Sequence, residues 1–350
     1  MKNRILSFQA KVDLPAGRQG NLFLRSLHAL RLVGMTMMGL FLLLTSSVSA
    51  QQVSLGLSPP LLEVLIKPGR SIMVAYNLEN SGDPVHINVK MASFEPKDNL
   101  GNVRIKDQLE GPIRFNLDNA DIELNTPFFL KSLSSQQLLL RIRIPENIEN
   151  GDYYYTLLAE TVPAASIEGI GSAQAKATIG ANILITVTDS GVVEVKPRIA
   201  LFDVLSKIKF NLFNKSIKIF DSFDNVPIVL IIENKGKNLI KPQGEITLRG
   251  SFGLTSKYDV ISKNILSESQ RLLEATPSAD IGRINSTPTS LNLSGFFTGL
   301  YRLSADINFG ENSPQIFAST SFFAFPFKLL FGLIIIIVGI IYIIKRFFSD

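Results

Sequence analysis

The stretch best suited to binding chemistry interleaves lysines with phenylalanines. Within residues 205–220, LSKIKFNLFNKSIKIF, the candidate partner-binding residues are Lys207, Lys209, Phe210, Phe213 and Lys215. Basic and aromatic side chains together suit an anionic wall polymer, a membrane surface or single-stranded nucleic acid. The alternative is an edge hairpin around Asn211 to Lys215 whose lysines discourage pairing between sheets. Arg141 and Arg143, on the polar side of a predicted strand, are further candidates, and for them too the alternative is a purely structural role.

Catalytic chemistry has little support in the residue types. The chain has two histidines and no cysteine, so thiol catalysis and cysteine-based zinc sites are excluded. His28 lies in the N-terminal segment, and His86 falls on the polar face of a predicted strand, where a solvated side chain is the simpler interpretation. No nucleophile-elbow, Ser-x-x-Lys or phosphate-loop motif occurs after residue 50. We therefore expect no enzyme activity, no cofactor and no metal.

Acidic residues in turn-like sequence are the remaining candidates for catalysis or metal binding. Asp118 with Asp121, and Asp221 with Asp224, could form carboxylate pairs, but each pair accompanies Asn in a context where Asp caps backbone amides. The segment KDNLGN, residues 97–102, could hold calcium through Asp98, although further oxygen ligands are not evident. We interpret it as a β-turn with Gly101 at positive φ.

The positive charge of the chain is concentrated at its N-terminus. Of 35 Lys and Arg and 30 Asp and Glu, six basic residues and one acid lie in residues 1–50, which leaves 29 of each in the rest. A chain with no net positive field is a poor partner for phosphate backbones, so nucleic acid is not an expected partner. The basic residues, the apolar run Leu32 to Leu44 and the small residues before Ala50 predict a signal peptide over residues 1–50.

The C-terminal end predicts a membrane anchor. Residues 329–344, LLFGLIIIIVGIIYII, carry no charge and would form a helix of about 24 Å. The aromatic segment SFFAFPF before this run would supply interfacial side chains, and Lys328 can extend towards water. Lys345 and Arg346 follow the run, which predicts a cytoplasmic C-terminus and an exported N-terminal part. We assign residues 323–346 to the membrane helix and its interface and 347–350 to a cytoplasmic stub.

Apolar residues recur with period two between the hydrophobic ends, which predicts strands rather than helices. Leu138, Leu140, Ile142 and Ile144, for example, alternate with Arg141 and Arg143. Two strands end in the same motif, Glu-Asn-x-Gly, at Asn80 and Asn234. We interpret the motif as a tight reversal for which Asn and Gly supply the backbone conformations.

A further short sequence, Gly-x-Tyr, repeats at a similar spacing. Gly151 and Tyr153 follow Asn80, and Gly299 and Tyr301 follow Asn234, so we expect a duplicated domain. A tyrosine just inside a late strand often anchors the corner of an immunoglobulin-like sandwich, with its hydroxyl bonded to backbone. The predicted fold class is all-β, with two immunoglobulin-like sandwiches in tandem and one C-terminal transmembrane helix.

The predicted boundaries follow from these marks. The first sandwich would span residues 51–191, a junction residues 192–197, and the second sandwich residues 198–322. Pro59 and Pro60 lie inside the first extended run and predict an edge or strand switch, because proline cannot donate to a ladder.

The order of these features resembles the bacterial WxL-interacting surface proteins. The resemblance covers roughly residues 53–346 and includes ENSG, IPENIENGDYYYTLLAE, VPIVLIIENKGKNLIKPQGEITL, GLYRLSADINFG and the terminal span. It implies a first domain that binds peptidoglycan and a second that meets a protein partner. The first domain is also similar to the N-terminal sandwich of periplasmic pilus chaperones, which lack the terminal span.

These observations together predict a non-catalytic surface protein. We expect a single-pass bacterial membrane protein with its sandwiches outside, acting in adhesion or as a scaffold on peptidoglycan or another surface protein. No small-molecule substrate is predicted. The alternative is an extracytoplasmic assembly chaperone, which would accept a client strand at a free sheet edge.

Overall fold

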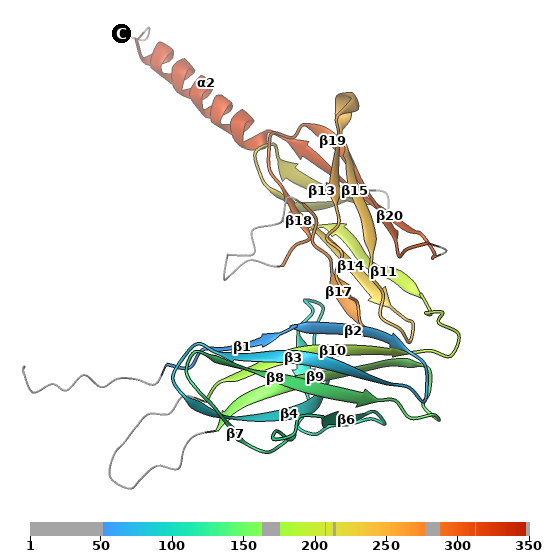
Figure 1. Ribbon diagram of the computed structural model, residues 1–350. Coiled ribbons are helices and arrows are strands. Elements are labelled where there is room, and N and C mark those ends of the chain that lie inside the picture. Colours follow the sequence, from blue (N-terminus) through green and yellow to red (C-terminus); the bar gives the residue numbers. More distant parts are fainter. Residues whose placement is uncertain are drawn as a thin grey trace, which may run out of the picture. The chain divides into compact units, whose positions relative to one another are not determined.

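The computed structural model describes residues 52–162, 176–206, 208–212, 215–276, 288–311 and 313–347. This part of the chain consists of strands, one short 3-10 helix and one long C-terminal α-helix (Figure 1). Two hydrophobic cores form within it, one from residues between Leu57 and Val187 and the other from residues between Val204 and Ala324. The predicted fold class, with immunoglobulin-like sandwiches and a single apolar helix at the C-terminal end, is confirmed.

The described residues of the first sandwich form ten strands. They are β1 (Leu55–Ser58), β2 (Leu61–Ile66), β3 (Ser71–Asn80), β4 (Val85–Pro96), β5 (Val103–Ile105), β6 (Arg114–Leu117), β7 (Phe128–Leu130), β8 (Ser134–Arg143), β9 (Gly151–Val162) and β10 (Thr178–Val187). One sheet has the order β1-β3-β8-β6, and the other has the order β2-β10-β9-β4-β5, with β7 also paired to β4. Alternating burial along β8 confirms the period-two prediction, because Leu138, Leu140 and Ile142 are fully buried.

The first extended run changes sheets at its prolines. β1 pairs antiparallel with β3, whereas β2 pairs parallel with β10. Pro59 and Pro60 stand between the two strands, where neither has to donate a hydrogen bond to a ladder, and the Pro60 carbonyl accepts from the amide of Asn182 at 2.9 Å. The predicted strand switch is confirmed.

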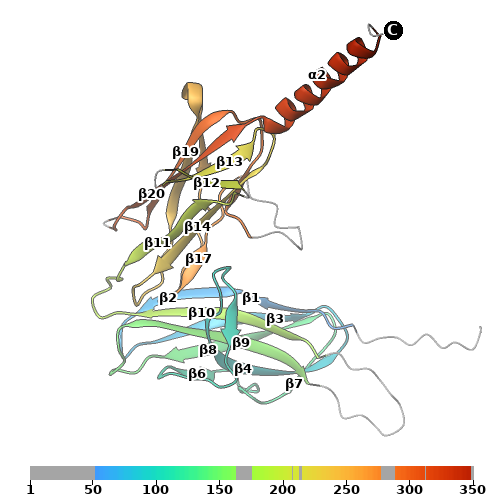
Figure 2. The same ribbon diagram turned by 180° about the vertical axis from the view of Figure 1, so that it is seen from behind.

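The second sandwich follows the same plan. Its strands are β11 (Pro197–Val204), β12 (Ile208–Leu212), β13 (Lys215–Asp221), β14 (Val226–Asn234), β15 (Gln243–Arg249), β16 (Thr255–Asp259), β17 (Gln270–Leu272), β18 (Leu291–Leu293), β19 (Gly299–Asn308) and β20 (Ile316–Phe325), with the 3-10 helix η1 (Ser251–Gly253) between β15 and β16. The sheets have the orders β11-β14-β17, with β18 also on β14, and β12-β13-β20-β19-β15-β16. Figure 2 labels β11, β14 and β17 of the first of these sheets and β12, β13, β19 and β20 of the second.

Equivalent pairings identify the duplication. β11 pairs antiparallel with β14 as β1 does with β3, and β13 pairs parallel with β20 as β2 does with β10. The β15–β19–β20 ladder likewise corresponds to β4–β9–β10. The second sandwich differs by the β12–β13 hairpin, which adds a strand at the sheet edge.

The two Glu-Asn-x-Gly motifs occupy equivalent places and make equivalent contacts. Asn80 ends β3 and Asn234 ends β14, and both side chains are buried. In each copy the side-chain oxygen accepts a hydrogen bond from the glycine two residues later, at 3.0 Å for Gly82 and 2.9 Å for Gly236. The amide group donates to backbone carbonyls of the same loop and of a second loop. Asparagine therefore stabilises the loop through the hydrogen bonds of its side chain.

Glycine has a different role in the motif from the one that we expected. A Cβ on Gly82 would lie 2.2 Å from the carbonyl oxygen of Gln52, and one on Gly236 would lie 2.8 Å from that of Glu194. Neither glycine is among those with positive φ. Glycine is needed because the preceding chain segment passes against it, and not because the reversal requires a left-handed backbone.

The corner tyrosines match their prediction. The hydroxyl of Tyr153 donates to the carbonyl of Glu149 at 3.0 Å, and that of Tyr301 accepts from the amide of Thr298 at 3.3 Å. Both rings pack against their own core. The repeated Gly-x-Tyr therefore marks the same corner in each sandwich.

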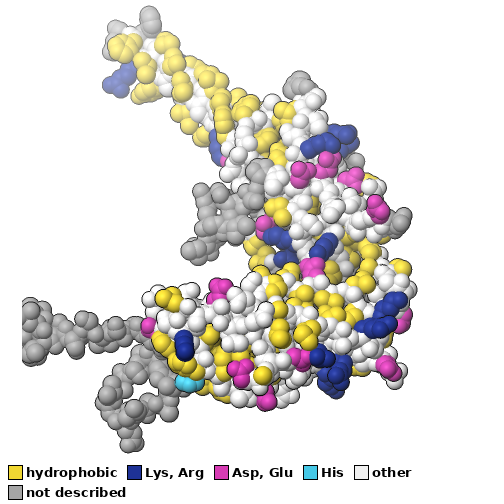
Figure 3. All heavy atoms as spheres, in the orientation of Figure 1, with side chains coloured by type: hydrophobic (Ala, Val, Ile, Leu, Met, Phe, Trp, Pro, Cys, Tyr) yellow, Lys and Arg dark blue, Asp and Glu magenta, His cyan; other side chains and the backbone are white. Residues whose placement is uncertain are grey.

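The C-terminal helix α2 spans Phe327–Phe347 and has no buried residues. Its mean hydropathy of 2.8 and its length are sufficient for a membrane span, and apolar side chains cover its surface (Figure 3). Residues 323–325, which we expected in the membrane interface, instead complete β20, and Phe322 is buried in the core. The alternation of β20 continues to Phe325, so only Pro326 separates strand from helix. The predicted signal peptide lies outside the described residues.

Candidate functional site

The lysine and phenylalanine stretch forms the edge hairpin β12–β13. Lys209 is exposed, and Phe210 is 56% exposed, whereas Phe220 is buried in the core. Lys218 is paired with Asp203 and donates to the Thr320 hydroxyl at 3.0 Å, so it joins β13 to its neighbours. Lys207, Phe213 and the side chain of Lys215 lie outside the described residues. The described part of the stretch therefore fits the edge-hairpin interpretation.

The arginine candidates lie together in a hollow on the outer face of the first sandwich. Arg141 and Arg143 alternate with buried residues along β8, so both point outward. Arg114 stands opposite Arg143 on the neighbouring strand β6 and Asn116 stands opposite Arg141. Residues that face each other on adjacent strands share a face, which brings three guanidinium groups onto one surface. The hollow has a volume of about 440 Å³ and is lined by Arg114, Phe115, Asn116, Asp118, Arg141 and Arg143.

One of the three arginines is neutralised within the hollow. Nε of Arg141 donates to Oδ2 of Asp118 at 2.6 Å, and the same guanidinium forms an ion pair with that carboxylate. The hydrogen bond from Arg141 lowers the pKa of Asp118, with a smaller contribution from the charge of Arg143. Asp118 consequently remains a carboxylate at neutral pH.

The other two arginines keep their charge available. Arg114 donates to the carbonyl of Gly111 at 3.3 Å. Among the described residues, neither Arg114 nor Arg143 has an acidic partner in an ion pair. Two guanidinium groups on one face present donors that match carboxylate or phosphate oxygens, and pairs of this kind are often bidentate. The arrangement can therefore hold an anionic group by hydrogen bonds and charge.

The four aspartates considered for catalysis have other contacts. Asp118 pairs with Arg141, and Asp121 is exposed. Asp221 is buried and accepts from the backbone amides of Phe223 and Lys328, at 3.2 and 2.9 Å. Asp224 is half-buried and is paired with the Lys328 ammonium. These contacts assign three of the aspartates to an ion pair or to the junction between β13 and α2.

The predicted KDNLGN turn has the expected geometry. Gly101 has a φ of 89°, and Asp98 accepts from the amides of Leu100 and Asn102. The Asn102 side chain donates to the second carboxylate oxygen at 2.8 Å. These hydrogen bonds lower the pKa of Asp98, with the Asn102 side chain as the largest cause. The carboxylate is engaged in stabilising its own loop.

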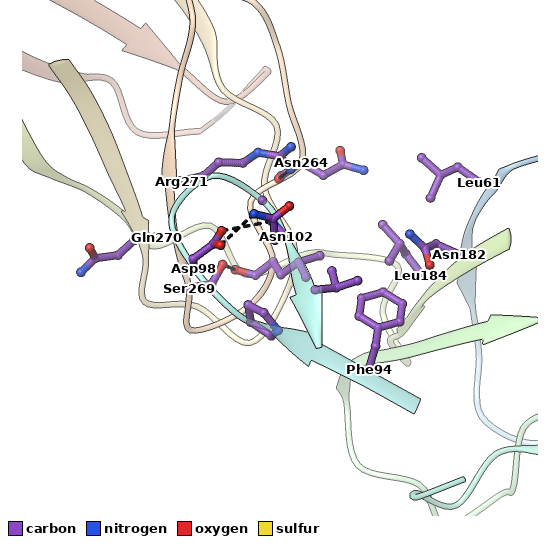
Figure 4. Close-up of a pocket in the computed structure, with 14 residues that line it drawn as sticks. Leu61, Phe94, Asp98, Asn102, Asn182, Leu184, Asn264, Ser269, Gln270 and Arg271 are labelled. Carbon is purple, nitrogen blue, oxygen red and sulfur yellow. Dashed lines mark hydrogen bonds between the residues drawn. The ribbon is translucent and has the colours of Figure 1, made fainter. Parts of the chain in front are cut away.

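A second hollow, of about 200 Å³, lies next to this turn (Figure 4). Its wall includes Phe94 and Leu184 on one side and Arg271 near the turn. Arg271 donates to the carbonyl of Asn264 at 2.6 Å, and burial lowers the pKa of its guanidinium. Of the described residues that line this space, only Arg271 is an arginine, so the outer hollow with three guanidinium groups is the stronger candidate for an anion.

Two charged residues of the outer hollow, Arg114 and Asp118, were not among the predicted site residues. Arg114 belongs to a strand of four residues, RFNL, which is too short to show a clear period. Asp118 was paired in sequence with Asp121, but the register of β6 against β8 directs it to Arg141. The only indication in the sequence that Arg114 points outward was the alternation of Arg114 and Asn116 with Phe115 and Leu117.

His86, predicted to be solvated, is exposed, and its ring lies 5.3 Å from the ring of Phe129.

Comparison with known proteins yields similar sandwich folds and no family. No family model matches the chain, and no curated protein sequence matches it. The resemblance to WxL-interacting proteins therefore has no support from these comparisons. Similar solved structures include the class 5 fimbriae chaperone CfaA, at 12% identity over 77% of this chain and 99% of that chain with a TM-score of 0.36.

Two further structures belong to the same group. The E. coli chaperone DraB has 12% identity over 76% of this chain and 98% of that chain, with a TM-score of 0.32. The Salmonella enterica SafA pilin in complex with the SafB chaperone has 10% identity over 78% and 99%, with a TM-score of 0.32. All three are structures of chaperones or of a chaperone complex.

Proposed function

We propose that this chain is a non-catalytic, membrane-anchored binding protein that holds an anionic partner in the arginine hollow of its first sandwich. One observation carries the proposal: Arg114 and Arg143 face each other on adjacent strands, with no acidic partner among the described residues. Like charges directly opposed on a sheet destabilise it unless an anion lies between them. The partner would supply carboxylates, from another surface protein or from peptidoglycan.

The membrane arrangement follows from α2. Its apolar surface and the basic residues of its last turn, Lys345 and Arg346, favour a span with the C-terminus in the cytoplasm. The sandwiches would then lie outside the membrane, where a partner on the cell surface can reach the hollow. A scaffold or adhesion role suits sandwich faces displayed in this way.

Binding of acidic probes by the full chain in detergent micelles tests the hollow. We expect an oligoglutamate peptide to bind, and the Arg114→Gln and Arg143→Gln variants each to weaken Kd about tenfold, since a hydrogen bond to a charged group contributes about 1.5–3 kcal/mol. Arg198→Gln, which removes an exposed arginine of the second sandwich, serves as the matched control and should leave Kd unchanged. Equal binding by all variants would exclude the hollow as the site.

Purified peptidoglycan gives the second arm of this test. Retention of the full chain on the polymer, lost in Arg114→Gln and kept in Arg198→Gln, would identify the wall as the source of the carboxylates. Binding of the peptide without retention on peptidoglycan would point to a protein partner.

The second candidate function is an extracytoplasmic assembly chaperone. β2 pairs with β10 only from Asn182 to Val187, so the segment Thr178–Ala181 is paired with β9 alone. A client strand could add to this free segment. Addition predicts that the amides of residues 178–181 exchange more slowly with deuterium when a partner binds. Unchanged exchange there, with binding that depends on Arg143, would exclude this mode.

A further inference from the structure

The end of the second sandwich that joins α2 is apolar. Strand register places the ends of β13, β18 and β20 and the starts of β14 and β19 together at this end. Large apolar side chains that are 44–61% exposed gather on its loops and strand ends: Phe223, Leu254, Phe296, Leu300 and Phe325. None of the described residues covers this exposed area, although the exposure of clustered apolar side chains to water is unfavourable.

Contacts fix these loops beside the start of the helix. The ring of Phe223 lies 5.0 Å from that of Phe296, and the amide of Phe297 donates to the Ser222 carbonyl at 2.9 Å. The next residue back, Asp221, accepts from the Lys328 amide at 2.9 Å in the first turn of α2. A carboxylate at a helix N-terminus stabilises both the unpaired amides and the helix dipole. The loops and the helix start are therefore one connected structure.

The length of α2 leaves no spacer between this end and a bilayer. Its 21 residues correspond to about 31 Å, and at the usual tilt of about 20° the helix crosses about 30 Å, which matches the hydrocarbon core. Only Pro326 separates α2 from β20. The headgroup layer extends about 5–7 Å beyond the hydrocarbon on each side. Loops that surround the helix start must consequently lie in that layer.

Charge on the same end also suits a lipid surface. Arg249 ends β15 and is directly opposed to Arg302 in β19, and both are exposed. Neither has an acidic partner among the described residues. Adjacent guanidinium groups match the phosphates of lipid headgroups, particularly in an anionic membrane.

The opposite end of the same sandwich has a different composition. Its loops, residues 235–242 and 260–269, carry mainly charged and polar side chains, among them Lys235, Lys237, Lys241, Lys263 and Glu268. Phe317, near that end of β20, lies eight residues from Phe325, or roughly 26 Å along the strand. The clustered apolar loops are thus a property of the helix end and not of the sandwich as a whole.

We infer that the Phe223 and Phe296 loops insert into the headgroup layer of the bilayer and seat the second sandwich directly on the membrane. The ligand of this surface is the lipid interface, where aromatic side chains are favourable. The inference rests on the proposed membrane anchoring. It adds that the sandwich is held against the membrane at two loops besides the helix.

Tryptophan fluorescence tests the insertion, because the natural chain contains no tryptophan. Phe223→Trp and, separately, Phe296→Trp would be introduced into the full chain and reconstituted in vesicles that contain anionic phosphatidylglycerol. Phe317→Trp, at a residue that is also exposed but lies near the other end of β20, is the matched control. Phe331→Trp, in α2, reports on anchoring itself.

We expect the emission at residues 223 and 296 to be blue-shifted and mostly lost when the lipids are brominated near the headgroup end of their acyl chains. Emission at residue 317 should be unaffected. If residue 331 is quenched while residues 223 and 296 behave like residue 317, the insertion is overturned and anchoring stands. If residue 331 is not quenched either, both proposals fail.

Discussion

At the scale of single residues, the two buried asparagines carry the repeated loop structure. Asn234 is fully buried and makes hydrogen bonds to the Gly236 amide and to carbonyls of residues 238, 265 and 266. Its counterpart Asn80 joins the loop after β3 to the carbonyl of Lys131. Each asparagine therefore substitutes for the backbone ladder where its strand ends.

We predict that Asn234→Ala lowers the free energy of unfolding by about 2–4 kcal/mol, because several buried groups lose their partners at a cost of about 1 kcal/mol or more each. Asn234→Asp should be nearly as damaging, since it keeps the acceptor but loses the donors. Urea denaturation of the full chain measures the effect. Asn292→Ala, at an exposed residue of β18, should change the value little.

Tyr76 presents the opposite case, a buried hydroxyl that has no hydrogen-bond partner among the described residues. Tyr76→Phe removes the unsatisfied oxygen and leaves the ring packing in place. We predict an increase of about 1 kcal/mol in the free energy of unfolding. A decrease in denaturation midpoint for this variant would show that the hydroxyl is satisfied in solution.

Burial also raises the pKa of Tyr76 to about 12. The unfolded tyrosine ionises near pH 10, so the folded state binds more protons than the unfolded state above that pH. Stability from this group is complete below about pH 10 and is lost as the pH rises through about 12. We predict a shallower alkaline loss of stability in Tyr76→Phe, although Tyr155, whose pKa burial also raises to about 12, still contributes.

At the scale of elements, the close passage of the chain past each motif glycine sets a strict size limit. We predict that Gly82→Ala lowers the free energy of unfolding by about 1–3 kcal/mol, because the new Cβ would meet the Gln52 carbonyl oxygen at 2.2 Å. Gly236→Ala should cost less, with its contact at 2.8 Å.

Gly56→Ala in β1 is the control for both substitutions. The nearest atom to its Cβ would be 3.7 Å away, and its φ is not in the left-handed region. Thermal unfolding of the three variants should rank them Gly82, Gly236, Gly56 in order of damage. Equal effects would show that backbone entropy, and not close approach, decides the outcome.

Elements with a clear alternating pattern could be predicted from the sequence. Strands β3, β8 and β19 alternate over ten residues each, and the prolines before β2 indicate the change of sheet. The start of α2 could not be placed as well, because the phenylalanines of residues 322–327 fit a strand and a membrane interface equally. Packing of Phe322 into the core decides for the strand.

At the scale of the whole molecule, the site depends on register between distant segments. The sequence indicated outward arginines at 141 and 143. Arg114 and Asp118 come to lie next to them only when β6 pairs with β8. No local pattern encodes that register, since β6 has four residues and ends an irregular segment. Likewise, the apolar loops beside α2 come from separate parts of the chain and meet through strand order.

The two sandwiches would use different surfaces for different tasks. The first would use its arginine hollow, and the second would use the Phe223 and Phe296 loops. The first would hold the partner through charge, and the second would hold the membrane through apolar loops. In this arrangement, loss of the partner through Arg143→Gln should not affect anchoring, and Phe223→Ser should not affect binding of an acidic probe.

Photo-crosslinking in the native cell tests the central claim most directly. Met73 is 51% exposed and stands opposite Arg141 on β3, so a photo-reactive side chain placed there reaches the hollow. We predict crosslinks to a partner at this residue that disappear in the Arg114→Gln and Arg143→Gln double variant and do not form from residue 317. Crosslinks at residue 73 that persist in the double variant, or that match those at residue 317, would contradict the account.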